Sequence, residues 1–463
     1  MVTPLQTIGS RRQLLQSATC GIGYLALMGL CKDSLAVGQG KSPLQPKVPH
    51  HPARAKQLIF LHMRGGPSAM ETFERKPELD AQAGKVAKSK SRKLTPSHWK
   101  WRQRGGSGLW VSDLFPHQAE HADDLCVLSG MHTDISNHTP AMLQLHTGSF
   151  AFTRPSMGAW ILYGLGTENQ DLPGFVSLCP PLINGGAKNY GSAFLPAIYQ
   201  GTAIGDIKTP IQDAKIGNIE NGRLTHRQQR RQLDLIQAMN RSTATAHPED
   251  SQIDGVIESF ELAFRMQAEV PTVFDISGET QSTLDRYGIG EKKPSDNFGR
   301  QCLLARRMIE SGVRVVEVCD EFWDQHNNLV KGHESRAAAT DQPIGALLAD
   351  LKERGMLDDT LVVWGGEFGR TPDTAQKTLD GRDHNAKGYT MWLAGGGVRG
   401  GFQHGKTDEL GYEAVEGRVH LHDLHATILH LLGLDHKQLT YRYAGRDFRL
   451  TDVHGVVVDE VLG

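Results

Sequence analysis

The chain has 463 residues, of which 39% are hydrophobic and 22% are charged, a composition typical of a soluble globular protein with a large core. The 50 Lys and Arg residues nearly balance the 52 Asp and Glu residues, and the formal net charge is −2. Such a balance creates no overall field that would attract nucleic acid or an anionic membrane, which argues against nucleic acid as a partner. A local site must therefore recognise any substrate.

The first 36 residues have the features of an export signal rather than of a folded segment. Arg11 and Arg12 precede a weakly hydrophobic run, residues 20–30, that is too short to span a bilayer. Small residues at 34–36 (SLA) suit a signal peptidase. The pattern favours a twin-arginine signal peptide, residues 1–36, over a plain secretory signal. We therefore expect the twin-arginine translocase as a partner during export, a periplasmic or other extracytoplasmic location, and no transmembrane segment in the mature chain.

The mature chain reads as a linker followed by one domain. Residues 37–54 are rich in Pro, Lys and Gly and lack periodicity, which predicts a linker, and a single domain then spans residues 55–463. Short apolar or β-branched runs predict strands at residues 57–63, 125–128, 174–178, 313–318, 361–364 and 389–393.

Helices alternate with these strands. One helical pattern runs from Asn297 to Ser311 and leads to the strand VRVVEV. A second, with Pro343 near its predicted start, leads to the strand LVVW, and a last helix is predicted to begin at the cap Asp423 and to end at Gly433. The order helix–strand–helix–strand predicts a doubly wound α/β fold, in which helices flank a mostly parallel sheet.

Two stretches do not fit this alternation. Residues 222–270 carry an apolar stripe at helical spacing and predict a helical insertion. Residues 85–104 contain eight Lys or Arg and no acid, together with Trp99 and Trp101. A solvated insertion loop is the favoured interpretation of this basic stretch, and binding of a polyanion remains the alternative.

Acidic residues and histidines cluster in loops next to the predicted strands. Because ligands bind beyond the carboxyl ends of parallel strands, these loops are the place to look for a site. Carboxylates and imidazoles there are typical of a site for zinc or manganese, although a single Asp-His pair is also common on protein surfaces. The residues concerned are Glu71, Asp324, His326, Glu367, Asp383 and His384. Paired glycines in RGGPS and WGGEFGR either let the backbone approach a ligand closely or form tight turns.

The segments FLHMRGGPSAMETFERKPEL, NHTPAMLQLHTGSFAFTRPSMGAW, WDQHNN, GGEFGRTP, GRDH and HDLHATILHLLGLDH carry a resemblance to a known family. From about Lys56 to its end, the chain resembles the domain-of-unknown-function family 1501, which belongs to the alkaline phosphatase and sulfatase superfamily. The resemblance implies one or two divalent metal ions, such as zinc, manganese or calcium, that clamp a phosphate or sulfate ester. It also implies that Asp324, His326 and His384 would bind one ion, and that Glu367 and Glu71 would bind the other.

The resemblance places the nucleophile less clearly. The family spacing, counted back from Gly148 through Pro140, points to His138, with Thr139 beside it. His138 would be a phosphoryl acceptor, a metal ligand or the mark of a site that has lost its esterase chemistry, and Thr139 would serve only if the loop shifts by one residue. The formylglycine-forming Cys of true sulfatases is absent.

Other residues near these motifs admit two interpretations. Arg370 and Arg382 suit contacts with an anionic substrate, and structural salt bridges are the alternative. His422 and His425 lead into the last helix and are expected to be capping or core residues rather than metal ligands. The early loop has Ala69 and Glu71 where the family shows His and Asp, so one metal position is expected to be weak or vacant.

The sequence thus predicts an exported metal-dependent hydrolase that acts on the sulfate or phosphate ester of a small molecule or a polysaccharide. The main alternative is a binding or scaffold protein that keeps the fold without catalysis. A third hypothesis, capture of a sulfated polysaccharide, rests on the basic stretch at residues 85–104.

Overall fold

The computed structural model describes residues 42–214, 223–246 and 251–463. The predicted export signal and the beginning of the predicted linker lie outside the described residues. From Ser42 onward the structure differs from the expected linker, because this segment packs against the domain. Leu44 is buried, and the backbone N–H groups of His50 and His51 donate to the carbonyl of Gly433. The domain therefore includes the segment 42–54.

A nine-stranded sheet forms the centre of the domain, in the order β14-β5-β13-β9-β1-β8-β6-β7, with β17 beside β5. Its strands are β1 (Gln57–Met63), β5 (Leu125–His132), β6 (Phe175–Leu178), β7 (Thr202–Ile204), β8 (Val315–Asp320), β9 (Thr360–Gly365), β13 (Tyr389–Ala394), β14 (Phe402–His404) and β17 (Val419–His420). Within this sheet, β13 is antiparallel to both of its neighbours, and the other pairs are parallel. Each predicted strand is present, because near-continuous apolar runs suit strands that are buried on both faces.

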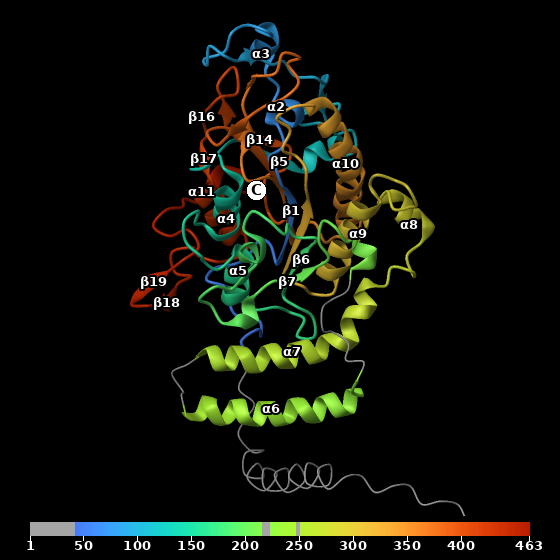
Figure 1. Ribbon diagram of the computed structural model, residues 1–463, viewed down its shortest axis with the longest axis vertical. Helices are drawn as coiled ribbons and strands as arrows, with labels where there is room; N and C mark the ends of the chain where they lie inside the picture. Colours follow the sequence, from blue (N-terminus) through green and yellow to red (C-terminus); the bar gives the residue numbers. More distant parts are fainter. Residues whose placement is uncertain (1–41, 215–222, 247–250) are drawn as a thin grey trace, which may run out of the picture.

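Helices cover both faces of the sheet (Figure 1). On one side lie α4 (His138–Thr147), α5 (Met157–Leu165) and α11 (Leu421–Leu431), and on the other lie α9 (Asp296–Glu310) and α10 (Leu329–Glu353). Three shorter helices are α2 (Ala69–Thr72), α3 (Pro77–Ala81) and α8 (Gln281–Arg286). This arrangement confirms the predicted doubly wound, mostly parallel α/β fold. Among the described helices, none combines the length and the apolarity that a membrane crossing requires.

The predicted starts of two helices are wrong. Pro343 lies in the interior of α10, which begins at Leu329, because the buried face of this helix continues well upstream of the proline. In α11 the capping residue is His420 rather than Asp423. Asp423 instead occupies the third helical position, where its carboxylate accepts from the N–H of His420 and completes a capping box.

The predicted helical insertion is a pair of helices, α6 (His226–Ala246) and α7 (Ser251–Phe274), that lie side by side at one end of the molecule (Figure 1). The basic stretch is partly ordered into β2 (Lys93–Leu94) and a hairpin of β3 (Trp101–Arg104) and β4 (Leu109–Ser112), and is not simply a solvated loop. Further short strands are β10 (Gly369–Arg370), β11 (Asp373–Thr374), β12 (His384–Asn385), β15 (Lys406–Thr407), β16 (Ala414–Glu416), β18 (Tyr441–Tyr443) and β19 (Arg446–Phe448).

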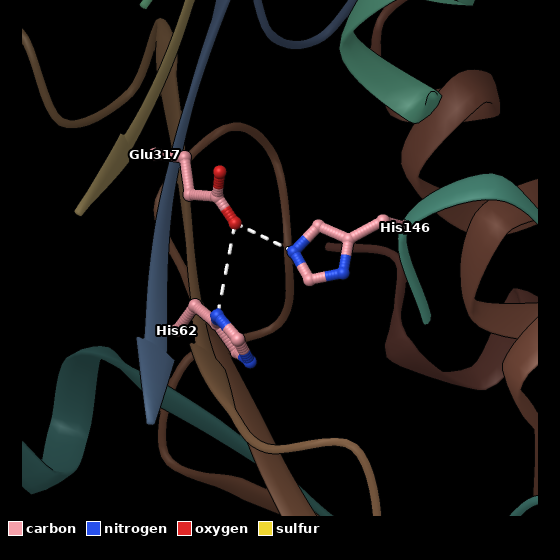
Figure 2. Close-up of side chains that lie close together, drawn as sticks. All are labelled: His62, His146 and Glu317. Atoms are coloured by element: carbon pink, nitrogen blue, oxygen red, sulfur yellow. Dashed lines mark hydrogen bonds and ion pairs between the residues drawn. The ribbon is translucent and has the colours of Figure 1, made fainter. Parts of the chain in front are cut away.

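A polar cluster lies within the apolar core, between the sheet and α4 (Figure 2). His62 lies in β1 and Glu317 lies in β8, two positions apart across the parallel register, so that both side chains project from the same face of the sheet. His146 reaches them from α4. All three residues are buried, with exposed fractions of 0%, 3% and 4% for His62, Glu317 and His146.

Candidate active site and metal centre

The candidate site forms at the carboxyl edge of the sheet. The loops after β1, β8 and β9 leave the sheet at this edge, and α4 begins there after β5. Because β13 is antiparallel to β9, the segment that precedes β13 also lies at this edge. The sheet topology therefore brings the loops with Asp324, Glu367 and His384 to one place.

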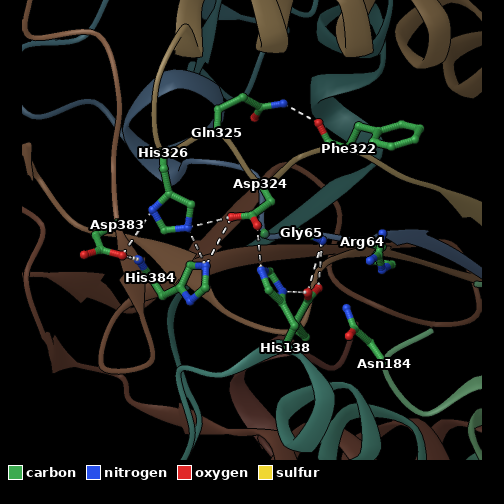
Figure 3. A network of polar contacts seen from close by, with 12 residues as sticks. Arg64, Gly65, His138, Asn184, Phe322, Asp324, Gln325, His326, Asp383 and His384 are labelled. Carbon is green, nitrogen blue, oxygen red and sulfur yellow. Dashed lines mark hydrogen bonds and ion pairs between the residues drawn. The ribbon is translucent and has the colours of Figure 1, made fainter. Parts of the chain in front are cut away.

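Three of the predicted ligand residues form a nearly equilateral triangle of ligand atoms (Figure 3). Asp324 Oδ1 lies 3.0 Å from His326 Nε2 and 3.1 Å from His384 Nε2, and the two Nε2 atoms are 3.0 Å apart. In a tetrahedral zinc site with bonds of about 2.0–2.1 Å, the distances between ligand atoms are only slightly longer than the three distances in this triangle. We call these residues the exposed cluster, because the Asp324 and His326 side chains are 39% and 42% exposed.

The outer nitrogens of the two imidazoles in the exposed cluster are already engaged. His384 Nδ1 lies 2.7 Å from the carbonyl oxygen of Ser136, which only accepts, so this nitrogen donates and leaves Nε2 with its lone pair. His326 Nδ1 lies 3.3 Å from Asp383 Oδ1. Asp383 thus orients the imidazole of His326 from outside the triangle, and it also forms with His326 and His384 a group of side chains that could hold an ion. Its other oxygen pairs with Arg92 of the basic stretch.

His138 lies beside the exposed cluster, at the first residue of α4. Its Nδ1 is 2.6 Å from Glu367 Oε1, and its Nε2 is 3.0 Å from Asp324 Oδ2. Burial lowers the pKa of His138, but the two carboxylates outweigh burial and raise it to about 9. His138 therefore links Glu367 to the exposed cluster, and its imidazolium form is favoured near neutral pH.

The carboxylates of the site are held in their ionised form. Burial raises the pKa of Asp324, but the hydrogen bond with His138 and the positive charge of Arg370 together hold it far below its usual range. For Glu367, which is fully buried, burial likewise raises the pKa, and the imidazoles of His138 and His62 lower it well below its usual range. Both groups are thus negatively charged over the physiological range, as metal ligands must be.

The first of the paired-glycine segments makes a close backbone contact. Gly65 has a φ of +114°, and a Cβ at this position would lie 2.6 Å from the backbone nitrogen of Asp324. The N–H of Gly65 donates to both carboxylate oxygens of Glu367, at 3.1 Å each. This glycine therefore lets the loop after β1 pack against the loop after β8 and fixes Glu367 at the same time.

Arg370 is buried and acts within the protein. Its Nη2 lies 2.7 Å from Asp324 Oδ1, and its guanidinium also donates to the carbonyls of Gly65 and Gly66. Its side chain is 0% exposed. The structure therefore places Arg370 as a support of Asp324 and of the RGG turn, which is the alternative to an anion contact.

Glu71 and Arg382, which the sequence analysis placed in the metal site and at the substrate, bind each other instead. Arg382 donates to Glu71 Oε1 from Nε at 2.9 Å and from Nη2 at 2.6 Å, and both side chains are fully buried. The other Glu71 oxygen accepts from the Ser97 hydroxyl and the backbone of His98. The structure thus does not bring Glu71 to the exposed cluster, and Arg382 secures the basic stretch to the domain.

Thr139 makes its side-chain hydrogen bond to a residue outside the exposed cluster. Its hydroxyl donates to Asn184 Oδ1 at 3.0 Å, and the residue is exposed. His422 and His425 are buried and lie close to backbone carbonyls, those of Gly148 and Leu145. Their expected role as core hydrogen-bonding residues is therefore confirmed.

No motif in the sequence pointed to His62, His146 and Glu317, which form a further group of side chains that could hold a metal ion. These residues lie within apolar strands and a helix, so they resemble core positions. A signal was present, however, because the near-continuous apolar runs QLIFLHM and VVEV, residues 57–63 and 315–318, each contain one ionisable residue. A residue of this kind in a doubly buried strand needs a partner.

The fold has distant structural likenesses. The lipoteichoic acid synthase LtaP from Listeria monocytogenes is 10% identical, with a TM-score of 0.36, over 91% of this chain and 80% of that one. The sulfatase PsFucS1 from Pseudoalteromonas sp. is 13% identical, with a TM-score of 0.35, over 82% and 68% of the two chains. The alkaline phosphatase from the Antarctic bacterium TAB5 is 11% identical, with a TM-score of 0.30, over 76% and 93%.

By sequence, the chain matches the model of a protein family but matches no single curated protein. None of the curated proteins matches the chain. The model of one family matches residues 55–462, nearly the whole of the described domain. The chain belongs to this family, which is described as "Protein of unknown function (DUF1501)".

Proposed function

We propose that this protein is an exported, metal-dependent hydrolase of sulfate or phosphate esters. The observation that supports this most is the triangle formed by Asp324 Oδ1, His326 Nε2 and His384 Nε2, with sides of 3.0–3.1 Å. A carboxylate and two imidazoles suit a divalent ion of the zinc class.

The three atoms of the triangle are better suited to binding a cation than to hydrogen-bonding with one another. Because His384 Nδ1 donates to Ser136, the lone pair of its Nε2 faces the Nε2 of His326 at 3.0 Å. If His326 likewise donates from Nδ1 to Asp383, two lone pairs point toward the same space. A divalent ion held by these three residues would supply Lewis acidity and lower the pKa of a bound water.

His138 is the residue of the chain best placed to handle a proton. Its two carboxylate neighbours favour the imidazolium form, which is a poor nucleophile but a proton donor. We therefore assign His138 the role of protonating the leaving oxygen of the ester, and Glu367 the role of fixing its imidazole. The attacking oxygen would be that of a water whose pKa the ion lowers, so the proposal needs no Ser, Thr or Cys nucleophile at the position of His138.

The exposure of the site bears on the size of the substrate. Asp324 and His326 are more than one-third exposed, and Arg92 of the basic stretch pairs with Asp383 at the border of the cluster. An ester group at the end of a small molecule or along a polysaccharide could therefore reach the exposed cluster without burial of the whole molecule.

The test uses the full-length protein, exported by its own host and assayed for bound metal and for hydrolysis of 4-nitrophenyl phosphate and 4-nitrophenyl sulfate. We expect turnover of at least one ester, and its loss together with the bound ion in the double variant His326→Ala/His384→Ala. The matched control is His226→Ala, which removes an exposed imidazole from the distant helix α6. Protein that carries no ion in the exposed cluster and turns over neither ester would refute the proposal.

One observation favours the alternative of a binding or scaffold protein. The hydroxyl of Thr139 is bonded to Asn184, and the imidazole of His138 is bonded to two carboxylates, so that no free nucleophile lies at the position the family spacing indicates. This alternative predicts that His138→Ala leaves ligand binding intact, whereas the hydrolase proposal predicts a fall in turnover with little change in the bound metal.

A further inference from the structure

The buried cluster, His62, His146 and Glu317, has a convergent geometry of its own (Figure 2). Glu317 Oε1 lies 2.6 Å from His146 Nε2 and 3.7 Å from His62 Nδ1, and the three ligand atoms lie within 4.8 Å of one another. The residues come from β8, α4 and β1, so three elements of the core meet at this point.

Two residues of the buried cluster, His146 and Glu317, have outer partners that orient them, whereas His62 faces a carboxylate beyond hydrogen-bond distance. His146 Nδ1 lies 2.8 Å from the carbonyl of Met142, so it donates there and directs Nε2 at Glu317. The second oxygen of Glu317 accepts from the hydroxyl of Ser177, directly opposite on β6, at 2.5 Å. His62 Nε2 faces Glu367 Oε2 at 3.9 Å. Carbonyls and hydroxyls that hold the far atoms of the ligands are common around metal ions in proteins.

His62 shows what the cluster lacks. Its side chain is 0% exposed, and neither of its ring nitrogens has a hydrogen-bond partner among the described residues. A buried imidazole without partners is disfavoured, because desolvation of its polar atoms is not offset. The ion pair between Glu317 and His146 accounts for the burial of these two residues, but it does not account for the burial of His62.

We propose that His62, His146 and Glu317 form a second, closed site for a divalent metal ion of the zinc class, separate from the exposed cluster. Two imidazoles and one carboxylate are a known zinc ligand set. An ion bound here gives His62 Nδ1 a partner and leaves its Nε2–H directed at Glu367. Since the site is closed to solvent, a water enclosed with the ion would fill the fourth position, and the ion has a structural role and is bound as the domain folds.

The buried cluster also touches the candidate active site through one residue. Glu367 lies between His62 Nε2, at 3.9 Å, and His138 Nδ1, at 2.6 Å. An ion in the buried cluster would therefore fix the imidazole that flanks Glu367 on its core side. The ion would position Glu367, while the chemistry of the ester would remain at the exposed cluster.

The test counts metal ions in a protein whose exposed cluster has been removed. Full-length His326→Ala/His384→Ala protein is produced in medium with zinc, and its zinc is measured by mass spectrometry after desalting. We expect about one zinc per chain, and a fall to below about a tenth when His62→Phe is added, since loss of one of three ligands abolishes tight binding. Cobalt in place of zinc should give the visible bands of a low-symmetry site in the first protein and not in the second.

Two further variants separate a ligand role from a packing role. His425→Phe, the matched control, replaces another fully buried imidazole, and it should leave the zinc content unchanged. His62→Cys keeps a zinc ligand and should retain the ion. The thermal midpoint should fall by about 5 °C or more with His62→Phe, because an ion that binds only the folded state stabilises it.

Two results would overturn the proposal. One is a folded His326→Ala/His384→Ala protein that contains no zinc. The other is a His62→Phe protein with the same zinc content and an equal or higher thermal midpoint, since removal of a merely unsatisfied imidazole should stabilise the core. Neither result depends on whether the exposed cluster hydrolyses an ester, so this proposal and the proposed function fail separately.

Discussion

The exposed cluster and the buried cluster contain the same kinds of side chain, two imidazoles and one carboxylate, in different surroundings. Asp324 and His326 are 39% and 42% exposed, whereas His62 and Glu317 are 0% and 3% exposed. Imidazoles lower the pKa of the carboxylate in both clusters, against the effect of burial, and that of Glu317 falls to about 2. The comparison teaches that the donor set decides which ion is bound, and that access to solvent decides whether the ion can meet a substrate.

The substitution Asp324→Asn should break the exposed cluster with the largest effect on function. Asp324 Oδ1 contacts both imidazoles of the triangle, so an amide there weakens the charge that holds the ion. We expect ester hydrolysis to fall by about 10³-fold or more, because a metal ion contributes several kcal/mol to the transition state. Assays of 4-nitrophenyl esters measure this, with Asp234→Asn on α6 as the control. Unchanged turnover in Asp324→Asn would remove the exposed cluster from catalysis.

The substitution Glu71→Ala should show that Glu71 lies outside the exposed cluster, because we expect a large loss of stability and no loss of bound metal. It leaves the buried guanidinium of Arg382 without its carboxylate, which should cost about 3–5 kcal/mol in the free energy of unfolding. Urea unfolding measures this. The metal content should not change, and the double variant Glu71→Met/Arg382→Met should recover most of the loss. A loss of bound metal without a loss of stability would restore Glu71 as a ligand.

The free energy of unfolding should depend on pH in opposite ways for His138, whose imidazole lies between two carboxylates, and for His425, whose imidazole is buried in the core. Burial lowers the pKa of His425 to about 3, below its unfolded value of about 6.5, so its contribution is lost as pH falls from 6.5 toward 3. Despite burial, the carboxylates raise the pKa of His138 to about 9, so its contribution is complete below pH 6.5 and is lost as pH rises through 9. In chelator-treated protein, urea unfolding across this range should show both slopes.

The corresponding variants assign these slopes. His138→Gln should flatten the alkaline slope without changing the acid slope, and His425→Asn should do the reverse. An alkaline slope that persists in His138→Gln would show that the carboxylates do not hold its proton.

The substitution Thr139→Ala should have the smallest effect. The lost hydrogen bond to Asn184 lies at the surface, so we expect a change of about 0.5 kcal/mol or less in stability. Turnover should change by less than about threefold, because no contact joins this hydroxyl to the exposed cluster among the described residues. A fall of a thousandfold would identify Thr139 as the nucleophile and would contradict the role given to His138.

Much of the fold could be predicted from the sequence because the central strands β1, β8, β9 and β13 are mostly apolar runs. The convergence of Asp324 and His326 with His384 could be expected as well, since strand-end loops of a parallel sheet share one edge. The pairing of Glu71 with Arg382 could not, because it joins residues 311 positions apart whose spacing shows no pattern.

The buried cluster could not be predicted from the sequence for a different reason. His62 and Glu317 have the periodicity of core residues, and only the register between β1 and β8 places them on one face. A sequence shows that an ionisable residue interrupts an apolar strand, but it does not show which residue across the sheet is its partner.

The direction of β13 has a consequence for how this protein can diversify. Because β9 ends and β13 begins at the same edge of the sheet, the segment 366–388 leaves the sheet and returns to it without crossing a face. It carries Glu367, Asp383 and His384, so an acid beside His138 and an imidazole of the triangle lie on one excursion of the chain. A single connection between neighbouring strands therefore places both groups, and an insertion or deletion within it would move them without altering the order of the sheet.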